Sequence, residues 1–143
     1  MSLNIHPKNT KIFIGHKNER EVFQNAFFNN SLHHAWLLEG PAGIGKASFA
    51  YSAARSILSY SKESSNEASL FSETELMPIK VLNFNFDENN LIHNRVSEST
   101  HVDLKIIERL DVDKSPYGQE IIPVSKVREL ESFFFKNFRR RRL

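Results

Sequence analysis

The spacing of apolar side chains in the first 60 residues predicts two helices with one short strand between them. Residues 18–30 place four apolar side chains on one face of a helix: Val22, Phe23, Ala26 and Phe27. The apolar run 35–38 is too short for a helix and is typical of a buried strand. After Lys46, apolar residues recur at the period of a second helix: Phe49, Ala50, Ala53, Ala54, Ile57 and Leu58. The predicted order is therefore strand, glycine-rich turn and helix.

The pattern between residues 61 and 100 is less regular. Residues 61–69 are polar and contain few apolar side chains, which indicates a loop. Residues 81–86 carry four apolar side chains in the manner of a strand, whereas residues 91–96 favour a helix. We therefore expect this part of the chain to be rich in loops.

Beyond residue 100 the sequence predicts one strand, one turn and one helix. Leu104 to Ile107 form the second predicted strand, and residues 111–118 turn at a proline and a glycine. Residues 121–124 are a short extended piece. Ser125 is then a plausible N-cap for a helix whose face is formed by Val127, Leu130, Phe133, Phe134 and Asn137.

Composition excludes several kinds of site. The 143 residues leave room for one domain, and 40% apolar with 25% charged residues is typical of a globular chain. The chain has no cysteine, which excludes disulfides, cysteine nucleophiles and thiolate zinc sites. The six histidines show no metal-ligand spacing, so no metal site is predicted. No apolar run approaches the roughly 20 residues needed to cross a bilayer, and no secretory signal is visible. We therefore expect a cytoplasmic protein without a membrane partner.

Residues 40–47 carry the chemistry of the chain. They read Gly-Pro-Ala-Gly-Ile-Gly-Lys-Ala, which is the pattern G-x-x-x-x-G-K of a phosphate-binding loop. The glycines allow the backbone to curl around a phosphate, and successive N–H groups together with a helix N-terminus attract the anion. Lys46 adds a mobile positive charge for the outer phosphates. We predict phosphate contacts at Gly40, Gly43, Ile44, Gly45, Lys46, Ala47 and Ser48.

The loop lacks the oxygen ligands expected of an ATPase. The position after Lys46 is normally Ser or Thr, whose hydroxyl binds Mg²⁺, but here it is Ala47. Ser48 lies about 100° further round the helix and does not simply substitute. A second strand ending in acidic residues is also missing, since the candidate segment 83–88 alternates Asn with Phe and favours a solvated loop. We therefore predict no catalytic residue and no metal ligand.

Several segments resemble the delta-prime subunits of the bacterial DNA polymerase III clamp loader, which are AAA+ P-loop proteins. The match is strongest where Leu32-His33-His34-Ala35-Trp36-Leu37-Leu38 leads into the loop at residues 40–46. Four further segments match more weakly: His6-Pro7, Ile14-Gly15-His16, His101-Val102-Asp103-Leu104 and residues 122–134. The resemblance spans nearly the whole chain, apart from a divergent stretch at residues 61–100.

The resemblance implies an α/β fold, namely an incomplete AAA+ P-loop core. Strand 1 would lie at Trp36–Leu38 and strand 2 at Leu104–Ile107, with flanking helices. The Walker B strand and all that follows it in the family are not recognisable, so we expect a truncated domain over residues 1–137. Residues 138–143 would then be a basic tail foreign to the fold, and the chain an N-terminal fragment.

The resemblance also implies a function. Delta-prime subunits generally do not hydrolyse ATP and act as a rigid stator while the motor subunits load the sliding clamp onto primed DNA. Expected partners are therefore the other clamp-loader subunits, with the clamp and DNA reached through the complex, and any ATP site would be weak or vestigial. Ile14, Gly15 and His16 match the segment that cradles adenine in the family. The family's Ser-Arg-Cys arginine-finger motif and its four-cysteine zinc module are both absent, so no zinc is expected.

Two other functions are compatible with the sequence. A small stand-alone P-loop enzyme that binds ATP would need metal carboxylates and an acceptor site, neither of which is visible. Direct DNA binding would rely on Arg139–Arg142, which supply four of the 19 basic residues, whereas the remaining 15 face 17 acidic residues. Because the basicity lies in one terminal run, overall charge does not argue for a nucleic-acid partner.

Overall fold

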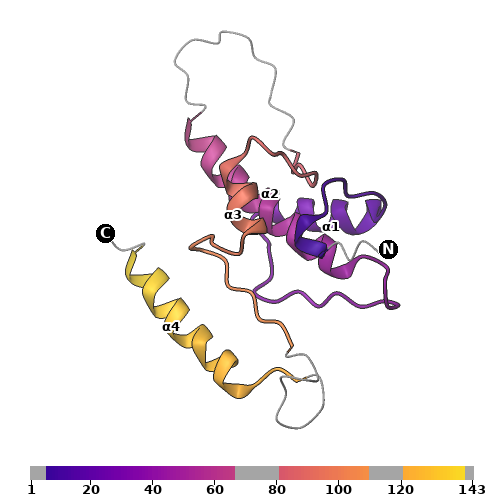
Figure 1. Cartoon of the computed structure of the whole chain (residues 1–143). Coiled ribbons are helices and arrows are strands. Elements are labelled where there is room, and N and C mark those ends of the chain that lie inside the picture. The colour runs from indigo at the N-terminus through magenta and orange to yellow at the C-terminus, as the bar shows by residue number, and fades with distance from the viewer. Residues whose placement is uncertain (1–5, 67–80, 110–120, 141–143) are drawn as a thin grey trace. The chain divides into compact units, whose positions relative to one another are not determined.

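The computed structural model describes residues 6–66, 81–109 and 121–140 (Figure 1). The chain divides into two compact units, Met1–Ser97 and Glu98–Leu143. The first unit contains a 3₁₀ turn η1 (Pro7–Asn9) and the helices α1 (Lys17–Phe28), α2 (Lys46–Asn66) and α3 (Leu91–Ser97). The second contains α4 (Val124–Arg140). No helix within these described ranges is long and apolar enough to pass through a bilayer.

The helices predicted in the first 60 residues are confirmed. Helix α1 begins one residue before the predicted range and ends at Phe28, two residues early, where Asn29 takes the C-cap position. Helix α2 begins at Lys46, immediately after the glycine-rich turn. It continues to Asn66, so the loop predicted at residues 61–69 is wrong as far as that residue. The remainder of that predicted loop lies outside the described residues.

An aromatic core holds the first unit together. Its fully buried members come from α1, α2 and two extended segments: Phe13, Phe23, Phe49, Ala53, Leu82 and Phe84. Phe23 meets Phe49 edge-to-face with ring centroids 5.9 Å apart, and Phe84 lies 5.9 Å from Phe49. Of the apolar stripe predicted on α2, Phe49 and Ala53 are buried and Ile57 packs against this core, whereas Ala50 is exposed.

The predicted α/β fold class is wrong, because the described residues form helices and no β-strand. Residues 35–38 are extended but have no partner strand. The side chain of Leu37 is 82% exposed, and Trp36 packs its ring against Phe23 instead. Leu104–Ile107 are likewise extended without a ladder. A strand requires a neighbour for its N–H and C=O groups, and in the described part of the chain no segment supplies one. The incomplete AAA+ core expected from the resemblance is therefore absent there.

Residues 81–90 form an extended segment and a turn that lead into α3. One main-chain bond, from the N–H of Phe86 to the carbonyl of Lys11 (2.8 Å), joins the segment to the N-terminal part of the unit. The side chain of Asn90 caps α3, since its Oδ1 accepts from the N–H of Ile92 at 2.9 Å. The helix predicted at residues 91–96 is confirmed, whereas residues 81–86 are extended without being a strand.

In the second unit, α4 begins at Val124 rather than after Ser125. The N-cap predicted at Ser125 is therefore wrong. The carbonyl of Pro123 accepts from the N–H groups of Lys126 (3.0 Å) and Val127 (3.3 Å) and closes the first turn. Lys105 forms an ion pair with Glu129 of α4 at 2.6 Å, which lowers the pKa of that carboxyl group. The predicted turn at residues 111–118 lies outside the described residues.

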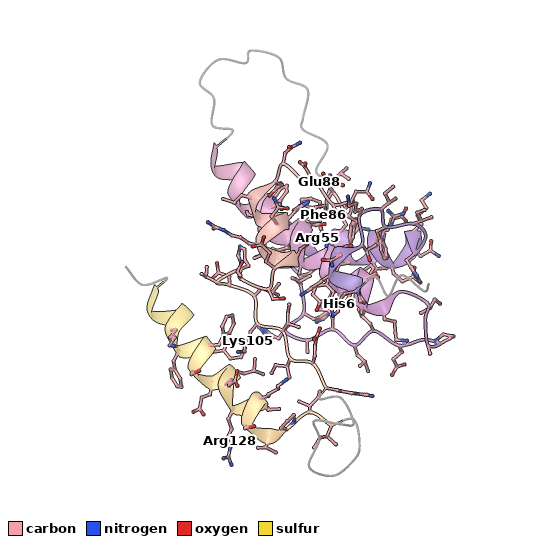
Figure 2. All side chains as sticks on the ribbon, viewed as in Figure 1. His6, Arg55, Phe86, Glu88, Lys105 and Arg128 are labelled. Atoms are coloured by element: carbon pink, nitrogen blue, oxygen red, sulfur yellow. The ribbon has the colours of Figure 1, made fainter. Side chains whose placement is uncertain are left out.

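Helix α2 also buries a polar stripe, which the sequence did not predict. Four residues at the spacing i, i+3, i+4 and i+7 are almost fully buried: Ser52, Arg55, Ser56 and Ser59. The guanidinium of Arg55 is 0% exposed and donates to the carbonyls of Lys8 (2.8 Å) and Thr10 (3.1 Å). It also lies over the ring of Phe86, with its carbon 5.3 Å from the centroid (Figure 2). No carboxylate pairs with Arg55 in the described residues.

His93 on α3 packs beside this polar stripe and is 2% exposed. Its Nδ1 accepts from the main-chain N–H of Asp87 at 2.8 Å. Burial lowers the pKa of His93, the positive charge of Arg55 lowers it further, and the charge of Asp87 opposes both. The imidazole is therefore held neutral, with its proton on Nε2.

Replacing Arg55 by Met should destabilise the first unit. The carbonyls of Lys8 and Thr10 would lose their donors, at a cost of about 2–4 kcal/mol in the free energy of unfolding. Urea unfolding followed by circular dichroism measures this cost. Arg128→Met, on the exposed face of α4, is the matched control and should change little. An unchanged midpoint for Arg55→Met would show that removing the buried charge offsets the lost hydrogen bonds.

The free energy of unfolding should also depend on pH through His93. Because its pKa is lower in the folded than in the unfolded protein, the unfolded state binds more protons below about pH 6.5. The contribution is complete above that pH and is lost progressively as the pH falls toward the pKa of the folded state. Urea titrations at several pH values between about 5 and 8 should show this decline, and His93→Gln should flatten it. An equal slope in the variant would assign the pH dependence to other groups.

Candidate phosphate-binding loop

The loop at residues 40–45 depends on backbone angles that favour glycine. Gly40, Gly43 and Gly45 have φ values of 145°, 79° and 101°. A Cβ at Gly43 would meet no atom within 4 Å, and one at Gly45 would meet only the His16 ring at 3.8 Å. Glycine is therefore required by conformation rather than by crowding.

Main-chain N–H groups gather where the loop enters α2. The first helical hydrogen bond runs from the N–H of Phe49 to the carbonyl of Gly45 at 2.8 Å. The N–H groups of Gly45, Lys46, Ala47 and Ser48 consequently have no acceptor within the described residues. Together with the positive end of the helix dipole, they form a site that attracts an oxyanion.

Lys46 folds back over this loop. Its Nζ donates to the carbonyls of Gly40 and Pro41, each at 2.7 Å. The ammonium group therefore lies at the start of the loop, and Lys46 lines the same cavity as Gly45. A phosphate on the N–H groups from Gly45 to Ser48 would meet a positive charge already in place.

His16 joins the loop from the start of α1. It adopts a left-handed backbone conformation with φ of 50°, and its Nε2 donates to the carbonyl of Ile44 at 2.9 Å. Its ring also stacks on Phe13, with centroids 5.7 Å apart. Gly15 precedes it with φ of 85°, and Ile14 is 82% exposed. Of the three residues predicted to cradle adenine, the structure brings His16 to the loop.

A cavity of about 110 Å³ lies beside the loop. Ile44, Gly45 and Lys46 line it on the loop side. Five further residues complete its wall: His16, Glu19, Leu38, Glu39 and Phe49. Ile14 and Gly15 are not among its lining residues. The two carboxylates were not singled out from the sequence, where neither belongs to a recognised motif.

The hydroxyl nearest to the missing metal ligand is already engaged. Ser48 Oγ shares a hydrogen bond with Thr10 Oγ1 at 3.1 Å, and Ala47 offers no oxygen. The two acidic residues of segment 83–88 are also engaged. Asp87 accepts from the N–H of Asn89, and Glu88 pairs with Lys11. Within the described ranges, no three His, Asp or Glu side chains gather as a metal site would require.

Comparisons with known proteins leave the chain without an assigned family. No protein family, no curated protein and no solved structure shows significant similarity to it. The likeness to delta-prime subunits therefore stays a prediction, carried by the residues quoted for it above.

Proposed function

We propose that residues 40–48 bind the phosphates of a nucleotide weakly, and that the chain serves as a non-catalytic subunit of the DNA polymerase III clamp loader. The observation that carries the first part is that the main-chain N–H groups from Gly45 to Ser48 have no acceptor in the described residues, in a loop that also carries the ammonium group of Lys46. The second part is supported by the sequence segments that resemble delta-prime subunits. Partners would be the other loader subunits in the cytoplasm, with the sliding clamp and primed DNA reached through the complex.

The donor set explains why binding would occur without turnover. An anion needs donors, and the loop offers four N–H groups and one ammonium. Hydrolysis also needs a metal held by oxygen ligands and a group that positions water. Ala47 lacks the oxygen, and the hydroxyl of Ser48 is bonded to Thr10. The loop would thus recognise phosphate through donors alone.

A stand-alone ATP-binding enzyme is the second candidate. The observation in its favour is that Glu19 and Glu39 line the cavity beside the loop. Carboxylates next to bound phosphates are ligands that Mg²⁺ accepts. Turnover of ATP that requires Mg²⁺ and is lost in Glu39→Gln would support this candidate over the non-catalytic subunit.

Lys46→Ala should weaken nucleotide binding at least tenfold, because it removes the one side-chain cation that lies on the loop. Titration of a fluorescent ATP analogue, with and without Mg²⁺, measures the affinity. We expect Mg²⁺ to add little, since Ala47 offers no hydroxyl and that of Ser48 is bonded to Thr10. Lys17→Ala is the matched control, because Lys17 is an exposed lysine paired with Glu21 on α1.

Assembly should be independent of the loop. We expect the Lys46→Ala protein to co-purify with the other clamp-loader subunits as well as the unmodified protein does. Loss of assembly in this variant alone would mean that bound nucleotide has a structural role. Failure of both proteins to associate with those subunits would refute the clamp-loader proposal while leaving the phosphate site intact.

A further inference from the structure

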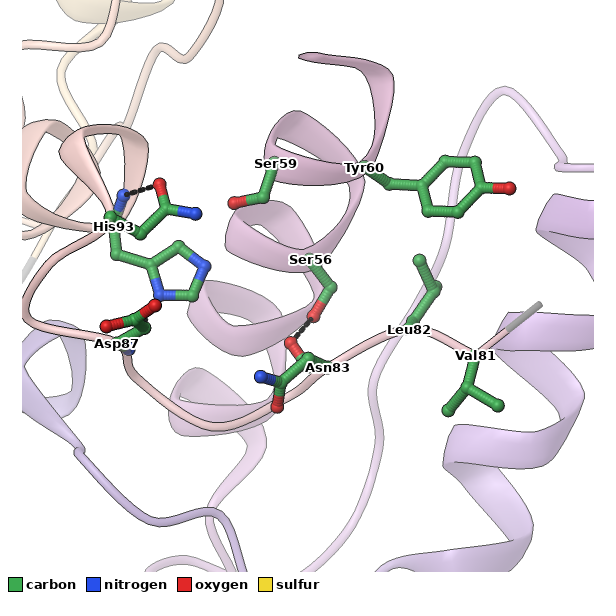
Figure 3. A pocket seen from close by; sticks show the side chains of 9 residues that line it. Ser56, Ser59, Tyr60, Val81, Leu82, Asn83, Asp87 and His93 are labelled. Carbon is green, nitrogen blue, oxygen red and sulfur yellow. Dashed lines mark hydrogen bonds between the residues drawn. The ribbon is translucent and has the colours of Figure 1, made fainter. Parts of the chain in front are cut away.

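A second cavity, of about 90 Å³, lies between α2, the segment 81–83 and the turn before α3 (Figure 3). Its lining has two chemically different ends. Ser59, Asp87 and His93 are polar, whereas Tyr60, Val81 and Leu82 present apolar surface. None of these residues belongs to the phosphate-binding loop, so the cavity is independent of the function proposed above.

Ser59 carries a hydroxyl group that the fold leaves without a partner. The residue is 6% exposed, and its Oγ makes no hydrogen bond to any described residue. The other serines of the buried stripe are satisfied. Ser52 Oγ accepts from Arg55 at 3.0 Å, and Ser56 Oγ lies 2.5 Å from the carbonyl of Asn83. Because native proteins rarely bury an unpaired hydroxyl, Ser59 points to a partner that the described residues do not supply.

The tautomer of His93 determines whether its ring donates or accepts a hydrogen bond in the cavity. Nδ1 accepts from the N–H of Asp87, so the neutral ring carries its proton on Nε2. In Figure 3 the ring lies between the turn that carries Asp87 and helix α2. A protonated Nε2 can neither ligate a metal nor take a proton from Ser59. His93 is therefore a hydrogen-bond donor to whatever the cavity holds.

Opposite charges beside the cavity disfavour a charged ligand. The carboxylate of Asp87 lines it and would repel an anion. A cation such as an amidinium carries only donors and would leave the Nε2–H of His93 without an acceptor. The positive charge of Arg55, which also acts on that ring, disfavours a cation further. A neutral group that combines an acceptor with a donor can accept from the Nε2–H of His93 and donate to the carboxylate of Asp87.

We propose that this cavity binds a small neutral carboxamide molecule. Its carbonyl oxygen accepts from His93 Nε2–H and from Ser59, whose hydroxyl reaches the ligand by a change of rotamer. Its NH₂ group donates to the carboxylate of Asp87, and its short alkyl group extends along the cavity. The volume is below the roughly 150 Å³ of a cavity that takes benzene, so it suits about four or five non-hydrogen atoms.

Three isosteric probes test the charge and hydrogen-bond pattern: acetamide, acetate and acetamidinium. Titration of the ¹⁵N-labelled full chain, followed by amide chemical shifts, should show saturable acetamide binding in the millimolar range, as the ligand's size allows. The shifts should centre on Ser59, Asp87 and His93, and both ions should bind at least tenfold more weakly. The absence of saturable acetamide binding, or equal binding of either ion, overturns the proposal.

Ser59→Ala separates a ligand site from a hydrated packing defect. The variant should bind acetamide about five- to tenfold more weakly, as expected for one lost hydrogen bond. Ser52→Ala is the matched control, because Ser52 is buried on the same helix but does not line the cavity. Unchanged affinity in Ser59→Ala would show that the ligand does not use this hydroxyl group and would overturn the proposed binding mode. The imidazole ¹⁵N shifts of His93 provide a second readout, and a proton found on Nδ1 would contradict the donor role.

Discussion

The guanidinium of Arg55 holds helix α2 to the N-terminal segment, and the rest of the first unit is arranged around that contact. It donates to the carbonyls of Lys8 and Thr10 and to the hydroxyl of Ser52, while Phe86 covers its face. Burial lowers the pKa of the guanidinium, but an arginine remains charged at neutral pH. A buried charge without a carboxylate must be satisfied by dipoles, which obliges residues 8–10 to lie against α2. A helix with an ordinary polar face could leave that segment in solvent.

The same N-terminal segment determines the chemistry of the loop. The carbonyl of Thr10 accepts from Arg55, and its hydroxyl shares a hydrogen bond with Ser48. Ser48 lies one residue beyond the position where a P-loop carries its metal-binding hydroxyl. The contact that fixes α2 therefore also engages the hydroxyl nearest to the missing ligand. The main-chain donors of the loop are unaffected, because they arise from the start of the helix itself.

The elements that the sequence predicted correctly are those that depend on residues three or four positions apart in the chain. Helices α1, α2 and α3 follow from the spacing of residues such as Phe23 and Phe49, and the turn at residues 40–45 follows from its glycines. The strand predicted at residues 35–38 was wrong, because an apolar run indicates a preference for burial but does not indicate whether a partner strand exists. Here Trp36 packs on Phe23 but stays 39% exposed, and Leu37 is 82% exposed. A strand's existence is a property of two segments, and a single pattern cannot reveal it.

The polar stripe was missed for a related reason. An amphipathic pattern leads one to expect polar side chains in solvent, but Ser52, Arg55, Ser56 and Ser59 are buried. The available signal was their size, since three small serines around one arginine let another segment approach the helix closely.

The two candidate sites use α2 in different ways. The loop at its N-terminus relies on unpaired main-chain donors and the helix dipole, which favour an anion. The cavity at Ser59, about 20 Å further along the axis, lies where the dipole no longer acts and where Arg55 and Asp87 counter each other. No residue lines both cavities, so a ligand in one has no direct contact with the other.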